Sequence, residues 1–278
     1  MINQKLFSTT QSQLFLQMMQ LISSNPNYLD FKTTINNVFS QLNKCFDDNL
    51  LLLNYEKTEY VQFTLESTVL HEAPIGCNNN FISNSTSTKF LGVIIEYTLS
   101  WKVHIDHHLP KLCVPCYSVR TVKPFMCQKN LNSVYCSYFH SLMTYGIIFW
   151  GNSTHSIHVF RLHERVIRIV TDSGLRDFCR QLFKKLGILL LMSQYIFSFL
   201  LFMTNNKVLF QMNFEIHSFN TRYNSDFHQQ LVNLTTHKNG TYYTGIKVLN
   251  YHPTRIKYLS DNVNQFRLAL RDFLHFIF

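Results

Sequence analysis

The chain has 278 residues, of which 46% are hydrophobic, with 25 Phe and 14 Tyr. This composition provides a substantial core and excludes a disordered chain, and only 8 Gly and 6 Pro argue against an all-β fold rich in tight turns. The formal net charge is +9 and the isoelectric point is near 9.2. A basic globular protein favours polyanionic partners, either nucleic acid or an acidic membrane surface, although a surplus of surface lysines for solubility gives the same number.

The cysteine content indicates a reducing compartment. There are 7 Cys, an odd number, and Met1–Thr10 has no apolar stretch typical of a secretory signal peptide. We therefore expect free thiols and an intracellular location, nuclear or cytoplasmic.

The first hundred residues mix helical and strand patterns. Asp30 is expected to cap a helix whose apolar side chains recur at helical spacing from Phe31 to Phe46. Short alternating or β-branched runs predict three strands, at Leu50–Asn54, Tyr60–Leu65 and Phe90–Glu96.

From about residue 103 onward helical spacing dominates. Helices are expected at 103–122, 128–145, 156–171, 176–187 and 190–204, and a last one at 261–276. Residues 205–245 are polar and irregular. The predicted fold class is therefore α+β, with a small mixed part followed by a mainly helical part.

Several short motifs occur in a consistent order along the chain. They are Asn49-Leu-Leu-Leu-Leu-Asn54-Tyr-Glu-Lys57-Thr58, then Lys89-Phe-Leu91-Gly92-Val93 with Trp101, then Tyr145-Gly146 with Trp150-Gly151, then Arg161-Leu162 with Arg165 to Ile169. In this order and spacing the chain resembles the C-terminal portion of the reverse transcriptase of jockey-like non-LTR retrotransposons. His163 stands where this family usually has Gln.

The resemblance implies a division of the chain. Residues 20–102 correspond to part of a polymerase palm, with a primer-grip-like hairpin that carries Leu91, Gly92 and Trp101. Residues 103–210 correspond to a helical thumb and connection, and residues 211–278 to a C-terminal region that ends in a helix. The fingers and most of the palm of such an enzyme would precede Met1.

The resemblance also implies a loss of catalytic chemistry. Reverse transcriptases use two Mg²⁺ ions, which need carboxylate ligands, and the family supplies adjacent aspartates in a Phe-Ala-Asp-Asp turn. That turn aligns with Phe15-Leu16-Gln17-Met18, so Gln17 and Met18 occupy the aspartate positions. An amide and a thioether cannot replace two carboxylates on Mg²⁺. We therefore expect no cofactor and no polymerase activity in this chain.

A reading-frame shift accounts for these two residues. The codons TTT-GCA-GAT-GAT, for Phe-Ala-Asp-Asp, give Leu-Gln-Met when read one nucleotide later, which is the order of Leu16-Gln17-Met18. The hypothesis is that residues 1–19 are out-of-frame sequence, in which case residues 1–14 have no designed fold. Absence of Ala-Asp-Asp in the alternative frame of the gene would contradict it.

The residues that remain available for function are basic. Lys57 matches the family's motif-D lysine, a proton donor to pyrophosphate that is useless without metals. For this chain the favoured interpretation is a solvated loop lysine. Basic residues that could follow the phosphates of an RNA–DNA duplex are spaced through the predicted helices: Arg120, Lys123, Lys129, Arg161, Arg165 and Arg168. Of these, Arg161, Arg165 and Arg168 fall on one face of a predicted helix and are the preferred candidates for contact with RNA or DNA. An ordinary solvated face explains the same spacing.

Particular residues suggest other functions. His104, His107, His108, Cys113 and Cys116 include a Cys-x-x-Cys, but no second Cys pair completes a zinc site. Residues 186–203 are apolar enough to suggest a small helical membrane protein instead. A polymerase subunit acting in trans is a further alternative. No motif indicates a small-molecule substrate.

Overall fold

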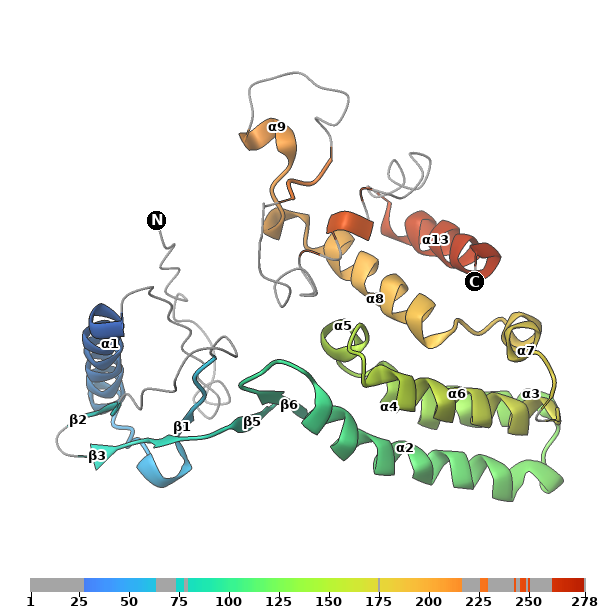
Figure 1. The fold of residues 1–278 in the computed structure, drawn as a ribbon, viewed down its shortest axis with the longest axis horizontal. Helices are drawn as coiled ribbons and strands as arrows, with labels where there is room; N and C mark the ends of the chain where they lie inside the picture. The colour runs from blue at the N-terminus through green and yellow to red at the C-terminus, as the bar shows by residue number, and fades with distance from the viewer. Residues whose placement is uncertain are drawn as a thin grey trace. The chain divides into compact units, whose positions relative to one another are not determined.

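The computed structural model describes residues 28–63, 74–77, 80–174, 176–216, 226–229, 243, 246–248, 250 and 262–277. The chain divides into two compact units, Met1–Thr98 and Leu99–Phe278. Of the residues that the structure describes, 66% are helical and 9% lie in strands, which confirms the α+β class in its general form (Figure 1).

The first unit is built on one long helix and short strands. Helix α1 (Tyr28–Asp48) is followed by the 3₁₀ turn η2 (Tyr55–Lys57) and six strands of two to four residues. The strands are β1 (Glu59–Tyr60), β2 (Gly76–Cys77), β3 (Asn80–Phe81), β4 (Ser83–Asn84), β5 (Ser87–Phe90) and β6 (Val93–Glu96).

These strands form three separate two-stranded pairs in the described part of the unit. Strands β1 and β4 are parallel, whereas β2 with β3 and β5 with β6 are antiparallel. A small core of Ile35, Phe39 and Ile75 joins α1 to β2. The Gly76 amide also donates to the Asn36 side-chain oxygen at 3.1 Å.

Several local predictions for this unit were wrong. Asp30 lies within the first turn of α1 instead of capping it, since α1 begins at Tyr28. Leu50–Asn54 forms no strand, and Leu50 and Leu52 are over 90% exposed. The predicted strand Phe90–Glu96 contains a tight turn, because Leu91 and Gly92 both have positive φ, at 46° and 84°. The run is therefore the tip and second strand of a β5–β6 hairpin.

The second unit consists of packed helices. These are α2 (Lys102–Val122), η3 (Lys123–Phe125), α3 (Gln128–Val134), η4 (Tyr135–His140), α4 (Ser141–Thr144), α5 (Ile147–Trp150), α6 (Ser156–Thr171), α7 (Cys179–Leu186), α8 (Leu191–Asn205), η5 (Lys207–Leu209), α9 (Asn213–Ile216) and α13 (Val263–Ile277). The helices predicted near 103–122, 128–145, 156–171, 176–187, 190–204 and 261–276 are confirmed, with shifts of a few residues at their ends.

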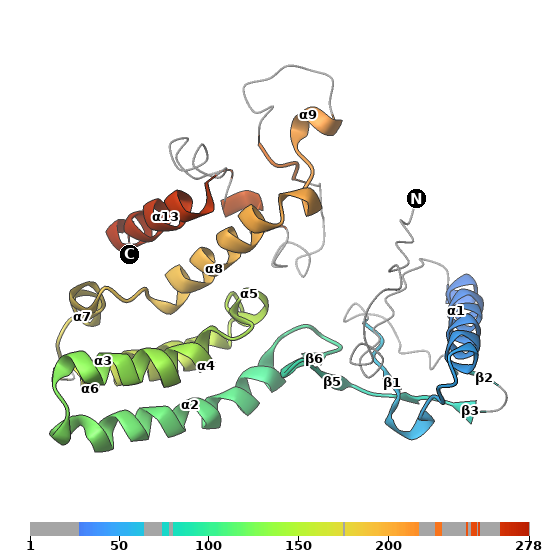
Figure 2. The ribbon, with the colours of Figure 1, turned by 180° about the vertical axis from the view of Figure 1, so that it is seen from behind.

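Helices α2 and α6 run side by side in the same direction (Figures 1 and 2). The Ser153 hydroxyl donates to the Ser100 carbonyl oxygen at 2.8 Å near the start of both helices, and Lys123 pairs with Asp172 near both ends. The larger core of the unit lies between α2, α6 and the helices from α3 to α5, with further side chains from α7 and α8. The imidazoles of His104, His108 and His163 are buried within it.

A π-helical segment, η4, continues α3 into α4. The buried residues along this run are Leu131, Tyr135, Phe139 and Met143, each four positions after the last. On an α-helix this spacing drifts by about 40° per step. The wider π turn reduces that drift and keeps all four side chains directed to the core.

A second core joins α8 to α13. Phe199, Leu200 and Met203 of α8 meet Phe266 and Leu270 of α13, and all are at most 3% exposed. The apolar face of α13 thus covers α8 within this unit.

Candidate nucleic-acid interface

Helix α6 carries the three arginines predicted to contact phosphates. Its buried face includes Val159, His163 and Val166, each 0% exposed, which places the arginines on the opposite side. Arg161 and Arg165 are exposed and lie one turn apart. Neighbouring Cβ atoms at this spacing are about 5–6 Å apart, so the two guanidinium groups form one positive stripe along the helix.

Arg168 is placed differently from the other two. It is half-buried, and its Nη2 donates to the Asp177 carbonyl oxygen at 3.3 Å. Its Nε is buried without a hydrogen-bond partner among the described residues. Arg168 therefore holds the connection between α6 and α7, and the exposed stripe consists of Arg161 and Arg165.

Helix α2 adds a further arginine next to this stripe. Burial raises the pKa of the Cys116 thiol on α2, while Arg165 and then Arg120 act in the opposite direction. Both guanidinium groups are thus close enough to the same thiol to affect it electrostatically. Because Arg120 is also exposed, α2 and α6 together present a basic patch, defined here as Arg120, Arg161 and Arg165.

Two other lysines at the end of α2 and on α3 do not extend this patch. Lys123 is paired with the Asp172 carboxylate, which neutralises its charge locally. Lys129 is exposed on α3, and no interaction ties it to the patch in the described structure.

The polymerase-like residues of the first unit lie on loops and turns. Lys57 is exposed at the end of η2, and its amide donates to the Asn54 side chain at 3.2 Å. Leu91 is 55% exposed at the tip of the β5–β6 hairpin, beside Gly92. Gln17 and Met18, the positions of the lost aspartates, lie outside the described residues.

Trp101 belongs to the second unit and has a packing role. It precedes α2 with a positive φ of 64°. Its ring stacks on Phe149 at a centroid distance of 6.1 Å and meets His104 edge-on. This arrangement fixes the entry of the chain into α2.

The histidines and cysteines of α2 do not converge on a metal. His104 and His108 are buried against Trp150, with ring centroids 6.1 and 5.9 Å from it, whereas His107 and Cys113 are exposed. Among the residues that the structure describes, no group of three or more His, Cys, Asp or Glu is arranged to hold a metal ion.

Burial governs the ionisation of the core histidines. Burial lowers the pKa of His104 to about 4, with His108 as the next cause. Burial also lowers the pKa of His163 to about 3, and the Nε2 of this ring lies 2.7 Å from the Tyr135 hydroxyl oxygen. Both imidazoles are neutral at pH 7 and add nothing to the basic patch.

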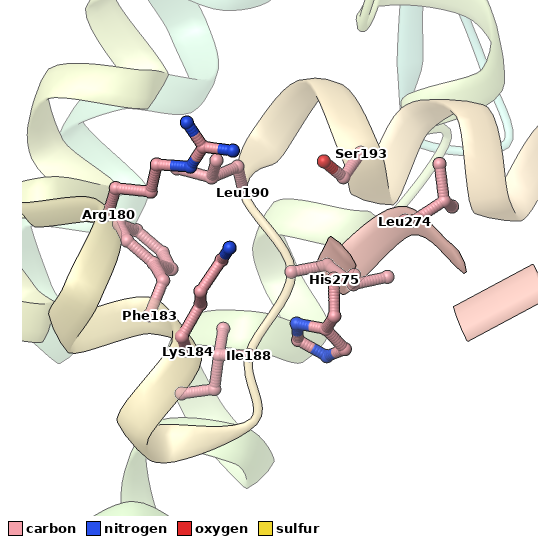
Figure 3. Close-up of a pocket in the computed structure, with 9 residues that line it drawn as sticks. Arg180, Phe183, Lys184, Ile188, Leu190, Ser193, Leu274 and His275 are labelled. Carbon is pink, nitrogen blue, oxygen red and sulfur yellow. The ribbon is translucent and has the colours of Figure 1, made fainter. Parts of the chain in front are cut away.

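A second group of polar residues was not predicted from the sequence. Arg180 and Lys184 of α7, Ser193 of α8 and His275 of α13 line one shallow pocket (Figure 3). No sequence signal could identify it, because α13 follows α8 only after a long intervening segment and contributes its residue through folding alone.

Comparisons with family models, with curated proteins and with solved structures gave no match.

Within the described residues no single helix is long and apolar enough to cross a membrane. Helices α7 and α8 reach the necessary length and apolar composition only together, and they are bent by 45° relative to each other.

Proposed function

We propose that this chain is a catalytically inactive remnant of a retrotransposon reverse transcriptase whose helical unit binds RNA or DNA through its phosphates. In this proposal residues 28–98 derive from a polymerase palm and its primer-grip hairpin, and the helices from α2 onward derive from a thumb and connection. The polymerase relationship is supported by the ordered motifs of the sequence. The binding activity is supported by the charges of the helical unit.

The distribution of charge is the observation that carries the binding proposal. The unit Met1–Thr98 has 5 Lys and Arg against 8 Asp and Glu, a formal net charge of −3. The unit Leu99–Phe278 has 20 Lys and Arg against 8 Asp and Glu, a formal net charge of +12. A general surplus for solubility would not be confined to one unit, whereas a polyanion-binding surface requires this concentration.

The basic patch is the part of this unit that best fits a phosphate backbone. Arg120, Arg161 and Arg165 project from two parallel helices, and guanidinium groups bind phosphate oxygens in a bidentate manner. A patch of this kind contacts the backbone and not the base edges. The expected binding is therefore sensitive to salt and insensitive to sequence.

The test compares two double variants of equal net charge. Arg161→Gln with Arg165→Gln removes the stripe on α6, whereas Lys32→Gln with Lys44→Gln removes two charges from α1. Fluorescence anisotropy of a labelled single-stranded RNA would be measured over a range of salt concentrations. We expect the α6 variant to lower the slope of log affinity against log salt by about 0.7 for each phosphate that it no longer neutralises.

The α1 variant is expected to leave both affinity and slope close to those of the parent protein. An equal effect of the two variants would mean that net charge alone drives binding, and RNA affinity that does not change with salt would contradict the proposal outright.

A further inference from the structure

The pocket between α7, α8 and α13 lies within the second unit and is separate from the basic patch. Apolar side chains, among them Phe183, Ile188 and Leu274, form part of its wall. The cavity volume is about 10 Å³, which is room for one water or for one oxygen atom of a larger group at the floor. Anything larger must enter through the open side.

Cationic side chains surround that open side. Figure 3 shows the Arg180 guanidinium, the Lys184 ammonium and the Ser193 hydroxyl turned toward the same opening. Arg180 and Lys184 are exposed and lie one turn apart on α7. Lys184 has no acidic partner among the described residues. The ion pair that these residues form joins Lys123 to Asp172.

Ser193 gives an independent indication of a ligand. The residue is 1% exposed, and its Oγ makes no hydrogen bond to any described residue. A buried hydroxyl without a partner destabilises the folded state. A helical serine usually satisfies itself on the carbonyl one turn earlier, and Ser193 does not. Its hydroxyl is therefore free to bond a group that enters the pocket.

The start of α8 adds backbone donors to the same place. Helix α8 has 15 residues, begins at Leu191 and has no side-chain cap at its N-terminus. The amides of a first turn have no partner within their helix, and together with the helix dipole they favour an anion. Ser193 lies in this first turn, so the hydroxyl and the amides are adjacent.

Helix α13 closes the pocket on the remaining side. The Arg271 Nη2 donates to the Gly187 carbonyl oxygen at 2.8 Å, which anchors α13 to the connection between α7 and α8. Burial lowers the pKa of His275, and Arg271 and Lys184 lower it further, against the opposing effects of the Gly187 carbonyl and Asp272. Arg271 and Lys184 are thus close enough to the His275 ring to lower its pKa, although Asp272 acts in the opposite direction.

We propose that this pocket binds a phosphate group. Arg180 and Lys184 neutralise its charge, and Ser193 Oγ with the first-turn amides of α8 hydrogen-bonds one oxygen at the floor. Donors that approach from two helices and from opposite sides fit a tetrahedral dianion, which offers more acceptor oxygens than a carboxylate. The site is independent of the basic patch and of its proposed role.

The test is a calorimetric titration of the full chain with inorganic phosphate. Lys184→Gln is compared with Lys185→Gln, because Lys185 is an exposed neighbour on the same helix that does not line the pocket. Loss of one charge-assisted hydrogen bond is expected to weaken the binding constant about tenfold or more, whereas Lys185→Gln should bind like the parent. Equal binding by both variants, or no binding by the parent protein, would overturn the proposal.

Ser193→Ala separates a ligand site from a structural role. Without phosphate the variant should be at least as stable as the parent, since it removes an unpartnered buried hydroxyl. In phosphate the parent should gain more thermal stability than the variant, with sodium chloride of equal ionic strength as the reference. A variant that is less stable without phosphate and binds it normally would refute the assignment, as would an equal gain in chloride.

A competition experiment between single-stranded RNA and inorganic phosphate distinguishes the two sources of the phosphate group. If the pocket accepts a phosphate of a bound nucleic acid, single-stranded RNA displaces inorganic phosphate, and Lys184→Gln weakens RNA binding. If it accepts free phosphate, RNA binding is unchanged by this substitution. The Arg161→Gln, Arg165→Gln variant should bind inorganic phosphate normally, so failure of the nucleic-acid proposal would leave this result intact.

Discussion

His163 is buried in the core, although its neighbours in the sequence suggest an exposed basic helix. It follows Arg161 on the helix that resembles a basic nucleic-acid-binding element, yet it is fully buried against Tyr135, Phe139 and Phe183. Its Nδ1 has no hydrogen-bond partner in the described structure. The imidazole therefore serves as a flat core side chain, in the position where the resembling family usually has Gln.

The buried imidazole makes stability depend on pH. The pKa of His163 is about 3 in the folded chain, against about 6.5 in an unfolded one. As the pH falls below 6.5 the unfolded chain takes up a proton that the folded chain does not, so stability is full above this value and declines toward pH 3. Each pH unit in this window costs about 1.4 kcal/mol.

Urea unfolding at pH 7.5 and 5.5 would measure this effect, and both tryptophans of the chain, Trp101 and Trp150, report on the helical unit. His163→Gln should reduce the difference between the two pH values. His104, with a pKa of about 4, contributes in the same direction and should account for the part that remains. An unchanged pH dependence in His163→Gln would show that the ring is not buried as described.

Leu91 has a left-handed backbone conformation that Asn or Gly adopts more readily than Leu. It lies beside Gly92 at the tip of the hairpin with a positive φ of 46°, which costs a non-glycine residue about 1–2 kcal/mol. Asn followed by Gly is the preferred pair when both central residues of a two-residue turn have positive φ. Leu91→Asn is therefore expected to stabilise the hairpin by about 1 kcal/mol.

Amide hydrogen exchange of β5 and β6 would detect this gain as slower exchange, with Phe81→Asn as the control for removal of an exposed apolar side chain elsewhere in the unit. If Leu91 serves as a contact with nucleic acid, the same substitution stabilises the hairpin and weakens RNA binding. Faster exchange in Leu91→Asn would mean that the leucine side chain supports the hairpin.

At the scale of elements, the predictability of this fold depends on length and periodicity. The long helix α6 was predicted because its apolar residues recur at helical spacing over four turns, and α8 because its apolar run is long. The four-residue apolar run at Leu50–Leu53 carries no such period, and it forms no strand, with Leu50 and Leu52 exposed and Leu53 packed against the small core of the first unit. The turn within Phe90–Glu96 could not be predicted from the sequence, because leucine has no preference for the positive φ that Leu91 adopts.

Helix α13 gives the clearest test of packing between elements. Leu270 is 0% exposed against α8, whereas Leu268 on the same helix is 65% exposed. Leu270→Ala should destabilise the helical unit by about 2–5 kcal/mol through reduced burial and a residual cavity, and Leu268→Ala should have little effect. Chemical denaturation followed by tryptophan fluorescence would compare them. Similar losses of stability would mean that α13 does not pack on α8 through this face.

At the scale of the whole molecule, two kinds of chemistry are separated along the chain. The polymerase-like motifs of the first unit accompany a net negative charge, and the helical unit holds the positive charge. The candidate site could be predicted only in part. Arg120 and the arginines of α6 were predicted from the sequence as basic helix residues, whereas the position of Arg120 next to the α6 stripe, the exclusion of Arg168 and the whole α7–α8–α13 pocket depend on which helices meet.

This separation predicts binding without synthesis. Gln17 and Met18 offer no carboxylate to Mg²⁺ or Mn²⁺, so purified protein should not extend a DNA primer on an RNA template with either ion. In the proposed function, RNA is retained by guanidinium and ammonium groups, which need no metal. It should therefore be unchanged by EDTA at constant ionic strength and should fall as salt rises. Template-dependent synthesis above background would refute the assignment of an inactive polymerase, and release of RNA by EDTA would show that a bound metal ion bridges protein and phosphate.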